Sequence, residues 1–241
     1  MTQTMLNDLY LPDQKRLVSL IVGRAGSGKS YFLKHTIRDF MKLNRDKNFR
    51  LIFVCPKEEM LLYNDVAPIR SEALEKHLRK NRTAVVWTDP RYMEAEMDYV
   101  IETVFMIQKH NPDFKCTVIM DDCQLVVRSR SSGTAGSREF RRIALTGRSK
   151  NIRFVGVSHE MVFSKEIEGQ TSFLVMFSMP FKLAHLDAKK RFGFDPAGYE
   201  EKLNERPYSF VWYDITQARA TLMNPIEVRE GSQVEPRAAS R

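Results

Sequence analysis

Hydrophobic positions along the chain fall into two patterns, short apolar runs and longer amphipathic stretches. The runs at residues 17–22 and 51–54 are almost wholly apolar, which is typical of strands buried on both faces of a sheet. Residues 29–43 and 93–110 instead carry apolar side chains three and four positions apart, which indicates amphipathic helices. The same patterns predict further strands at 83–87, 116–120, 152–157, 172–177 and 208–213, and further helices at 69–80, 138–145, 183–192 and 197–204.

Strands that alternate with helices favour an α/β fold with a central, mostly parallel twisted sheet covered by helices on both faces. No internal repeat interrupts this alternation. We expect one domain over residues 17–225, an N-terminal extension at 1–16 and a polar, flexible C-terminal tail at 226–241. No apolar run approaches the roughly 18–20 residues that cross a bilayer, so no transmembrane segment is predicted.

Composition narrows the class of protein. A hydrophobic content of 43 % and a charged content of 28 % are typical of a globular chain and exclude disorder throughout. The formal net charge of +8 favours contact with a polyanion such as nucleic acid. Cys55, Cys116 and Cys123 lack the spacing of metal ligands, so we expect buried, reduced thiols and no zinc site.

The segment at residues 23–30 reads G-R-A-G-S-G-K-S and lies between a predicted strand and a predicted helix. This is the P-loop pattern in its required context, in which glycines allow backbone N–H groups to point at phosphates. Lys29 is expected to reach the β- and γ-phosphates, and the Ser30 hydroxyl to hold Mg²⁺. The predicted nucleotide-binding residues are Gly23, Arg24, Ala25, Gly26, Ser27, Gly28, Lys29, Ser30 and Tyr31.

A second motif, formed by two acidic residues, follows the strand predicted at 116–120. Asp121 and Asp122 directly follow this apolar run, as the carboxylates of a Walker B motif do. Asp121 is then expected to hold Mg²⁺ and Asp122 to orient the attacking water. The alternative is that the pair caps the following turn. Two predicted strands lie between the P-loop and Asp121, which favours the additional-strand, RecA-like branch of P-loop proteins over small kinases and GTPases.

A third segment bears on family. Residues 146–148 read Thr-Gly-Arg, and residues 154–159 form a strand that ends in Ser158 and His159. With the P-loop, the acidic strand end and the late strands near Phe173 and Asp214, this arrangement resembles the FtsK–HerA superfamily over about residues 17–214. It is most similar to the viral genome-packaging ATPases of tailless, membrane-containing phages and large DNA viruses.

The resemblance implies an ATPase, with ATP and Mg²⁺ as cofactors, that translocates viral double-stranded DNA into a preformed capsid. It further implies DNA-stimulated hydrolysis, a homo-oligomeric ring (pentamer or hexamer), a capsid or membrane protein at the packaging vertex, and a location in the virion and host cytoplasm. Two positions depart from the family pattern. Asp122 replaces the usual Glu, and His159 stands where the polar sensor is usually Gln.

Ring-forming ATPases of this type complete their site with an arginine from the neighbouring subunit, which accelerates hydrolysis by about 10³–10⁵. Arg148 occupies the matching Gly-Arg turn and is the first candidate; Arg142 and Arg191 follow, then Arg138 and Arg141. Arg128 and Arg130 flank a Gly/Ser-rich loop after the acidic strand, which we expect to contact DNA phosphates or else to be an ordinary solvent-exposed loop.

Two other functions fit the same motifs. A helicase or conjugation-type DNA pump of the superfamily would share every site residue and differ in separating strands. A virion assembly or morphogenesis protein that uses nucleotide only as a switch would bind nucleotide without appreciable turnover. A small-molecule kinase is disfavoured, since no Arg-rich lid is apparent in the sequence.

Overall fold

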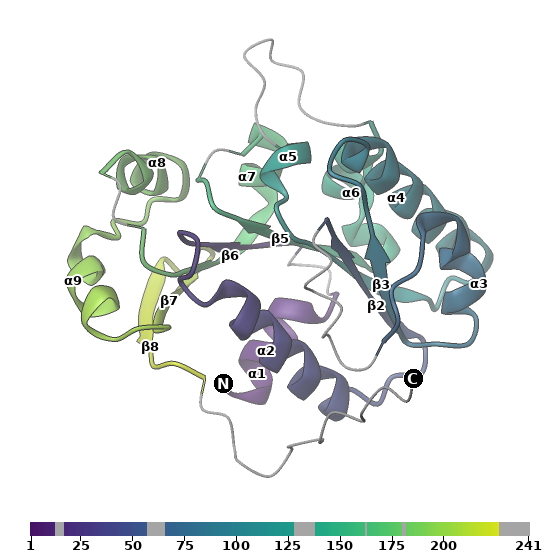
Figure 1. The fold of residues 1–241 in the computed structure, drawn as a ribbon, viewed down its shortest axis with the longest axis horizontal. Coiled ribbons are helices and arrows are strands. Elements are labelled where there is room, and N and C mark those ends of the chain that lie inside the picture. The colour runs from purple at the N-terminus through teal and green to yellow at the C-terminus, as the bar shows by residue number, and fades with distance from the viewer. Residues whose placement is uncertain (13–16, 57–65, 128–137, 162, 180–181, 227–241) are drawn as a thin grey trace, which may run out of the picture.

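The computed structural model describes residues 1–12, 17–56, 66–127, 138–161, 163–179 and 182–226. Within them, eight strands form one sheet in the order β3-β2-β4-β5-β1-β6-β7-β8 (Figure 1). The strands are β1 (Val18–Val22), β2 (Phe49–Cys55), β3 (Thr83–Trp87), β4 (Lys115–Met120), β5 (Ile152–Ser158), β6 (Thr171–Met176), β7 (Phe210–Asp214) and β8 (Arg219–Met223).

The six strands from β3 to β6 in this order are parallel, whereas β7 and β8 are antiparallel additions at one edge. The predicted α/β class with a mostly parallel sheet is therefore confirmed. β5 lies between β1, which leads into the P-loop, and β4, which leads into the acidic pair. This inserted strand is the feature that defines the predicted additional-strand branch.

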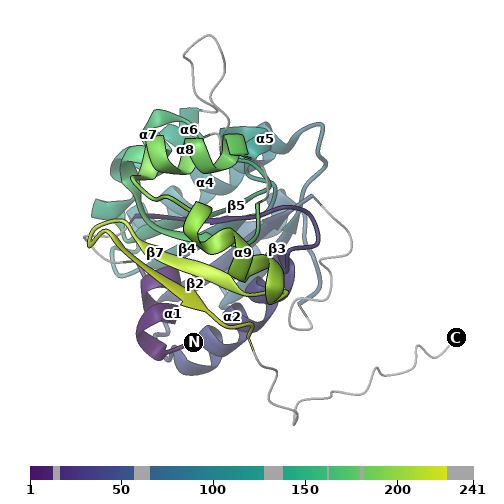
Figure 2. The same ribbon diagram turned by 90° about the vertical axis from the view of Figure 1, so that its left-hand side faces the viewer.

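Helices cover both faces of the sheet (Figures 1 and 2). On one face α1 and α2 pack with an aromatic-rich cluster, and on the other a larger cluster includes residues of α3, α4, α6, α7 and α8. Neighbouring residues of β1 divide between the two faces, since Ile21 belongs to the first cluster while Leu20 and Val22 belong to the second. The helices are α1 (Gln3–Tyr10), α2 (Lys29–Leu43), α3 (Leu74–Leu78), α4 (Met93–His110), α5 (Gln124–Val127), α6 (Arg138–Thr146), α7 (Lys165–Gln170), α8 (Lys182–Phe192) and α9 (Ala197–Glu205).

The structure differs from the sequence predictions at residues 69–80 and in the last two strands. Ile69, expected in a helix, pairs with Val86 beside β3, and helical structure is confined to the short segments Ser71–Ala73 and Leu74–Leu78. The late strand is antiparallel, and it is followed by β8, which the apolar pattern did not predict because its residues are exposed or half-buried. Residues 227–241 of the expected tail lie outside the described residues. Among those described, no helix has the length and apolarity to cross a bilayer.

The N-terminal extension includes α1, whose inner face is buried in the core at Leu6, Leu9 and Tyr10. The C-terminal end of α1 is held by Arg153, a fully buried residue of β5. Its guanidinium donates to the carbonyl oxygens of Asp8 and Leu11 (3.0 Å for Leu11) and to the Ser19 hydroxyl (2.7 Å). Because helix carbonyls at this end carry partial negative charge, they compensate a buried cation. α1 is thus fixed to the middle of the sheet.

Candidate nucleotide-binding site

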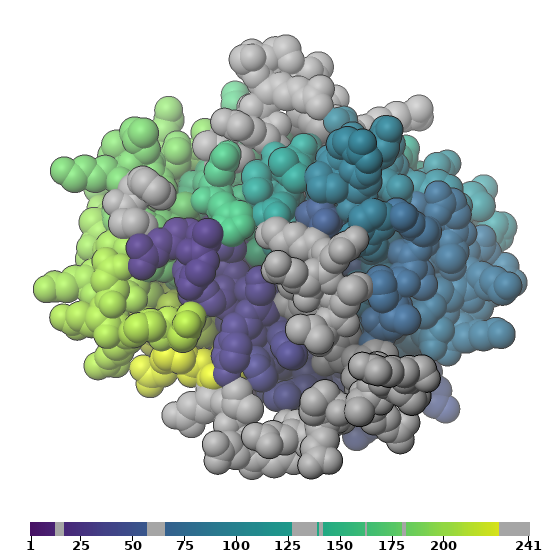
Figure 3. All heavy atoms as spheres, in the orientation of Figure 1, coloured from purple at the N-terminus to yellow at the C-terminus, as the bar shows by residue number. Residues whose placement is uncertain are grey.

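The segments singled out in the sequence meet at one edge of the sheet. β1, β4, β5 and β6 are parallel, so their C-terminal ends lie side by side, and β7 begins at that same edge because it is antiparallel. The backbone N–H of Gly23, directly after β1, donates to the Ser158 carbonyl at the end of β5 (3.3 Å). Residues 24–26 after β1 and parts of α2 reach the surface, bordered on one side by the yellow-green C-terminal part (Figure 3). Open α/β sheets bind ligands at such an edge.

Glycines shape the loop between β1 and α2. Gly26 (φ 73°) and Gly28 (φ 103°) adopt left-handed backbone conformations, which side chains disfavour. A Cβ atom on Gly23 would lie 2.6 Å from Phe177 Cβ, and one on Gly28 would lie 2.7 Å from the Tyr208 ring. Gly28 directly precedes α2 and provides no side-chain cap, so the positive end of a 15-residue helix faces the loop. This is an anion-binding geometry.

Lys29 lies inside this loop, with only 5 % of its surface exposed. Its ammonium nitrogen donates to the carbonyl oxygens of Gly23 (2.6 Å) and Arg24 (2.9 Å) and contacts His159 Nδ1 (3.0 Å). The side chain is therefore folded back over the loop in the position expected of a phosphate-binding lysine.

His159 joins Lys29 to the acidic pair. Its Nε2 lies 3.1 Å from Asp122 Oδ1, while its Nδ1 faces the Lys29 ammonium. Because an ammonium only donates, Nδ1 must accept, and the ring proton then lies on Nε2, from which it is donated to Asp122. The geometry thus selects a neutral imidazole in one tautomer. A continuous hydrogen-bonded chain Lys29–His159–Asp122 links the first residue of α2 to the residues that follow β5 and β4.

The acidic pair has an unusual backbone. Asp122 has φ 52°, a left-handed conformation that Asp tolerates better than most side chains. Its N–H donates to Asp121 Oδ1 (3.1 Å), and its own Oδ1 also accepts from Gln124 Nε2 (3.3 Å). Asp121 is 2 % exposed and Asp122 9 %. The turn directs Asp122 toward His159 while Asp121 continues the line of β4.

The residues suit Mg²⁺ by their chemistry. Ser30 in the first turn of α2 and Asp121 at the end of β4 offer hydroxyl and carboxylate oxygens, the donors that Mg²⁺ prefers. Among the described residues, no group of three or more His, Cys, Asp or Glu side chains is arranged to hold a metal ion. A nucleotide-associated Mg²⁺ needs no such cage, because phosphates and waters complete its coordination.

Cys123 directly follows Asp121 and Asp122, and its thiol is unreactive. Burial, reinforced by the carboxylates of Asp121 and Asp122, raises the pKa of its thiol well above the ordinary value. The thiol therefore stays protonated, and thiolate chemistry is excluded at this position. A Cβ on Gly156 would lie 2.9 Å from the Cys123 sulfur, so the thiol fills space between β4 and β5.

The structure places Arg148 before β5, at the N-terminal ends of the parallel strands. It precedes β5, whereas the P-loop lies beyond the C-terminal end of that strand, and seven residues at about 3.3 Å each separate the two ends by about 20 Å. Arg148 is exposed and makes one long contact to Gln170 (3.4 Å). It is not brought together with Lys29, Asp122 and His159 within one subunit.

The other arginine candidates with described side chains are engaged internally. Arg142 pairs with Glu139 (3.0 Å) and lies over the Phe105 ring. Arg191 pairs with Glu168 and Asp187. The side chains of Arg138 and Arg141, and the predicted DNA-contacting residues Arg128 and Arg130, lie outside the part of the chain that the structure describes.

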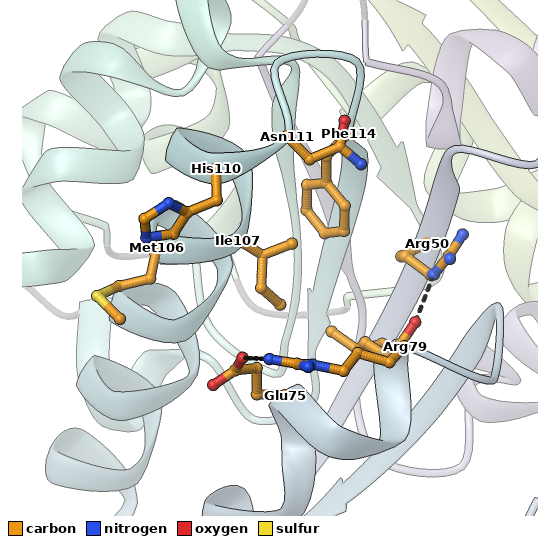
Figure 4. A pocket seen from close by; sticks show the side chains of 9 residues that line it. Arg50, Glu75, Arg79, Met106, Ile107, His110, Asn111 and Phe114 are labelled. Atoms are coloured by element: carbon orange, nitrogen blue, oxygen red, sulfur yellow. Dashed lines mark hydrogen bonds and ion pairs between the residues drawn. The ribbon is translucent and has the colours of Figure 1, made fainter.

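A separate pocket of about 380 Å³ lies between α3, α4 and the start of β2 (Figure 4). Among its lining residues, Arg50 lies at the start of β2 and Phe114 directly precedes β4. The pocket therefore lies toward the N-terminal ends of the parallel strands, away from the P-loop. Its cations are engaged by its own walls, since Arg50 Nε donates to the Leu78 carbonyl (2.9 Å) and Arg79 pairs with Glu75 (2.6 Å).

The two left-handed glycines predict different sensitivities to substitution. Gly26→Ala and Gly28→Ala should each lower the free energy of unfolding by about 1–2 kcal/mol through backbone strain. Gly28→Ala should lose about 1 kcal/mol more, because its Cβ meets the Tyr208 ring whereas space around Gly26 is open. Urea unfolding without nucleotide measures both. Equal losses would contradict the close contact with Tyr208.

No model of a known protein family matches the chain, and no curated protein matches its sequence. Solved structures do match. The genome-packaging NTPase B204 of Sulfolobus turreted icosahedral virus 2, in complex with AMP, aligns with a TM-score of 0.68 and 16 % identity over 89 % of this chain and 100 % of that one. The cytoplasmic domain of the Thermomonospora curvata type VII secretion ATPase EccC aligns with a TM-score of 0.66 and 14 % identity. This alignment covers 96 % of this chain and 31 % of that one.

VirB4 of Thermoanaerobacter pseudethanolicus gives a TM-score of 0.60 and 8 % identity over 92 % of this chain and 97 % of that one. These proteins are of the kind that the sequence resemblance indicated, FtsK–HerA-type ATPases. At such low identity the likeness concerns the arrangement of the chain in space. The protein therefore has the fold of these P-loop ATPases.

Proposed function

We propose that this protein is an ATP-hydrolysing motor that translocates viral double-stranded DNA into a preformed capsid as a homo-oligomeric ring. The observation that carries the ATPase part is the chain Lys29–His159–Asp122 at the mouth of a left-handed glycine loop. The packaging part is supported by the likeness to B204, which is named a genome-packaging NTPase, and by the net charge of +8.

Phosphate binding begins with an exchange of partners at Lys29. Its ammonium leaves the Gly23 and Arg24 carbonyls for the β- and γ-phosphate oxygens, while the N–H groups at the start of α2 receive the remaining charge. Ser30 and Asp121 are the residues that would hold Mg²⁺, which when bound neutralises charge on the β- and γ-phosphates.

Hydrolysis then depends on Asp122 and His159. Asp122 accepts a hydrogen bond from the attacking water and orients it toward the γ-phosphate. When Lys29 turns to phosphate, His159 Nδ1 is released and can accept from water, while Nε2–H still holds Asp122 in place. His159 thereby reports the state of the phosphate to the catalytic carboxylate, the role that Gln fills in the resembling family.

The position of Arg148 fits a role in trans. It lies at the N-terminal ends of the parallel strands, too far from the P-loop of its own subunit to contact a nucleotide there. It is exposed and is held by one long hydrogen bond, whereas Arg142 and Arg191 form ion pairs. We propose that it completes the site of the adjacent subunit and there stabilises charge on the γ-phosphate.

The sequence motifs leave a second candidate open, a helicase or conjugation-type DNA pump with the same site residues. Both candidates hydrolyse ATP, and neither depends on the capsid for turnover. Separation of a forked duplex would favour the helicase-like alternative. Nucleotide binding without turnover in the presence of DNA would instead favour a nucleotide-switched assembly protein.

The first test is ATP turnover with and without duplex DNA. Wild type should turn over ATP, and duplex DNA should stimulate it, because a translocating motor couples hydrolysis to its track. Lys29→Ala should reduce turnover to near zero, whereas Lys34→Ala, an exposed lysine of the same helix, should leave it unchanged. Turnover that persists in Lys29→Ala would contradict the assignment of the site.

The second test separates hydrolysis from binding. Asp122→Asn should lower turnover about 10²–10⁴-fold while ATP still binds, because the amide is a poor base for water. His159→Gln should retain most turnover, since its amide can both accept from Lys29 and donate to Asp122, whereas His159→Leu should lose it. Equal activity of the two His159 variants in a steady-state ATPase assay would refute the proposed relay.

The third test asks whether Arg148 acts between subunits. Arg148→Ala and Lys29→Ala should each be inactive alone, the former because removal of such an arginine costs about 10³-fold or more. Mixed rings of the two should regain turnover, because an intact site on one subunit can receive an intact Arg148 from the other. Lys29→Ala mixed with Asp122→Asn is the control and should stay inactive, since neither subunit then has an intact site. Absence of recovery in the mixture of Arg148→Ala and Lys29→Ala would exclude the trans role.

A further inference from the structure

Tyr208 connects the last part of the chain to the P-loop. It lies between α9 and β7, and β7 begins at the edge of the sheet where the P-loop lies. Its ring is close enough to Gly28 that a Cβ there would lie 2.7 Å from its Cδ1 atom. In the sequence Tyr208 lies at the start of a predicted strand, far from the P-loop, and no local pattern marks it as part of a site.

A second tyrosine lies beside it. Tyr31, in the first turn of α2, has its ring centroid 6.3 Å from that of Tyr208, with 28° between the ring planes. Its other neighbour is His35, whose ring centroid is 4.3 Å away. Burial and nearby cations lower the pKa of His35, which favours its uncharged form. The ring packs against that of Tyr31. We call Tyr31 and Tyr208 together the aromatic ledge.

The ledge is exposed, and packing of the core does not account for it. Tyr31 is 40 % exposed and Tyr208 55 %, among the largest exposures of aromatic side chains in the described residues. Tyr208 also has φ 66°, a left-handed conformation that is rare for a bulky aromatic residue. A strained backbone that directs an exposed ring onto the start of α2 is typical of a ligand contact.

The two rings border the loop that is proposed to hold the phosphates. Tyr31 directly follows the exposed Ser30, and the Tyr208 ring lies against Gly28, so a nucleoside attached to phosphates on residues 23–30 would lie within reach of both rings. A nucleobase is a flat π-system that stacks on tyrosine, and a half-exposed ring offers one free face for it.

We propose that the aromatic ledge is the nucleobase subsite of the P-loop, with Tyr208 as its stacking surface and a purine as its occupant. This inference rests on the proposed nucleotide-binding function. Stacking does not read base edges, so the ledge favours the larger ring system of a purine and gives little discrimination between adenine and guanine.

The test compares ATP with inorganic tripolyphosphate, which has the phosphates and no base. Tyr208→Asn removes the ring but keeps a residue that tolerates left-handed backbone, and Tyr208→Phe keeps the ring. Tyr99→Ala, at an exposed tyrosine of α4, is the matched control. Isothermal titration calorimetry gives the dissociation constant of each variant for both ligands.

Tyr208→Asn should weaken ATP and GTP binding about tenfold, in line with the loss of one base-stacking contact, and leave tripolyphosphate binding unchanged. Tyr208→Phe and Tyr99→Ala should match wild type. Unchanged ATP affinity in Tyr208→Asn, or equal weakening of ATP and tripolyphosphate, would overturn the inference while leaving the P-loop assignment intact. Wild-type protein that binds neither ligand would overturn the proposed function and this inference with it.

Discussion

The site depends on how the charge of Lys29 is compensated. Two loop carbonyls and one imidazole nitrogen accept hydrogen bonds from an ammonium group that is almost fully buried. Burial of a lysine is costly unless hydrogen-bond acceptors replace water, so these contacts help to fix the shape of the loop. They also fix the tautomer of His159 and through it the position of Asp122. One buried cation therefore organises three strand ends.

Sheet order makes this possible. β4, β5 and β1 are adjacent and parallel, so the carboxylate, imidazole and loop that follow them lie at one edge. The left-handed turn at Asp122 then redirects a side chain that would otherwise continue along β4. The strand β5 also contains Arg153, which holds α1, and Arg148 lies in the turn that precedes this strand. It thus joins the N-terminal helix, the proposed interface with a neighbouring subunit and the proposed catalytic site.

Most of the sheet could be predicted because its parallel strands are buried on both faces and appear as apolar runs. α1 and β8 could not, since α1 is short and its burial depends on Arg153, more than 140 residues later, while β8 lies half-exposed at an edge. The P-loop and the acidic pair were predicted from local pattern alone, and the structure brings them together at the C-terminal ends of the parallel strands. The contact of Tyr208 with Gly28 was not, because it arises from an antiparallel strand and a left-handed backbone that no local pattern announces.

The order of strands has a consequence for biosynthesis. β1 emerges from the ribosome before every other strand, yet its two partners in the sheet are β5 and β6, which are made much later. Both edges of an apolar strand stay unpaired in the nascent chain until most of the polypeptide exists, and such non-local pairing is slow and prone to aggregation. Residues 17–22 therefore keep two unpaired edges for most of translation, and the loop that follows them reaches its final surroundings only after β5 and β6 have been made.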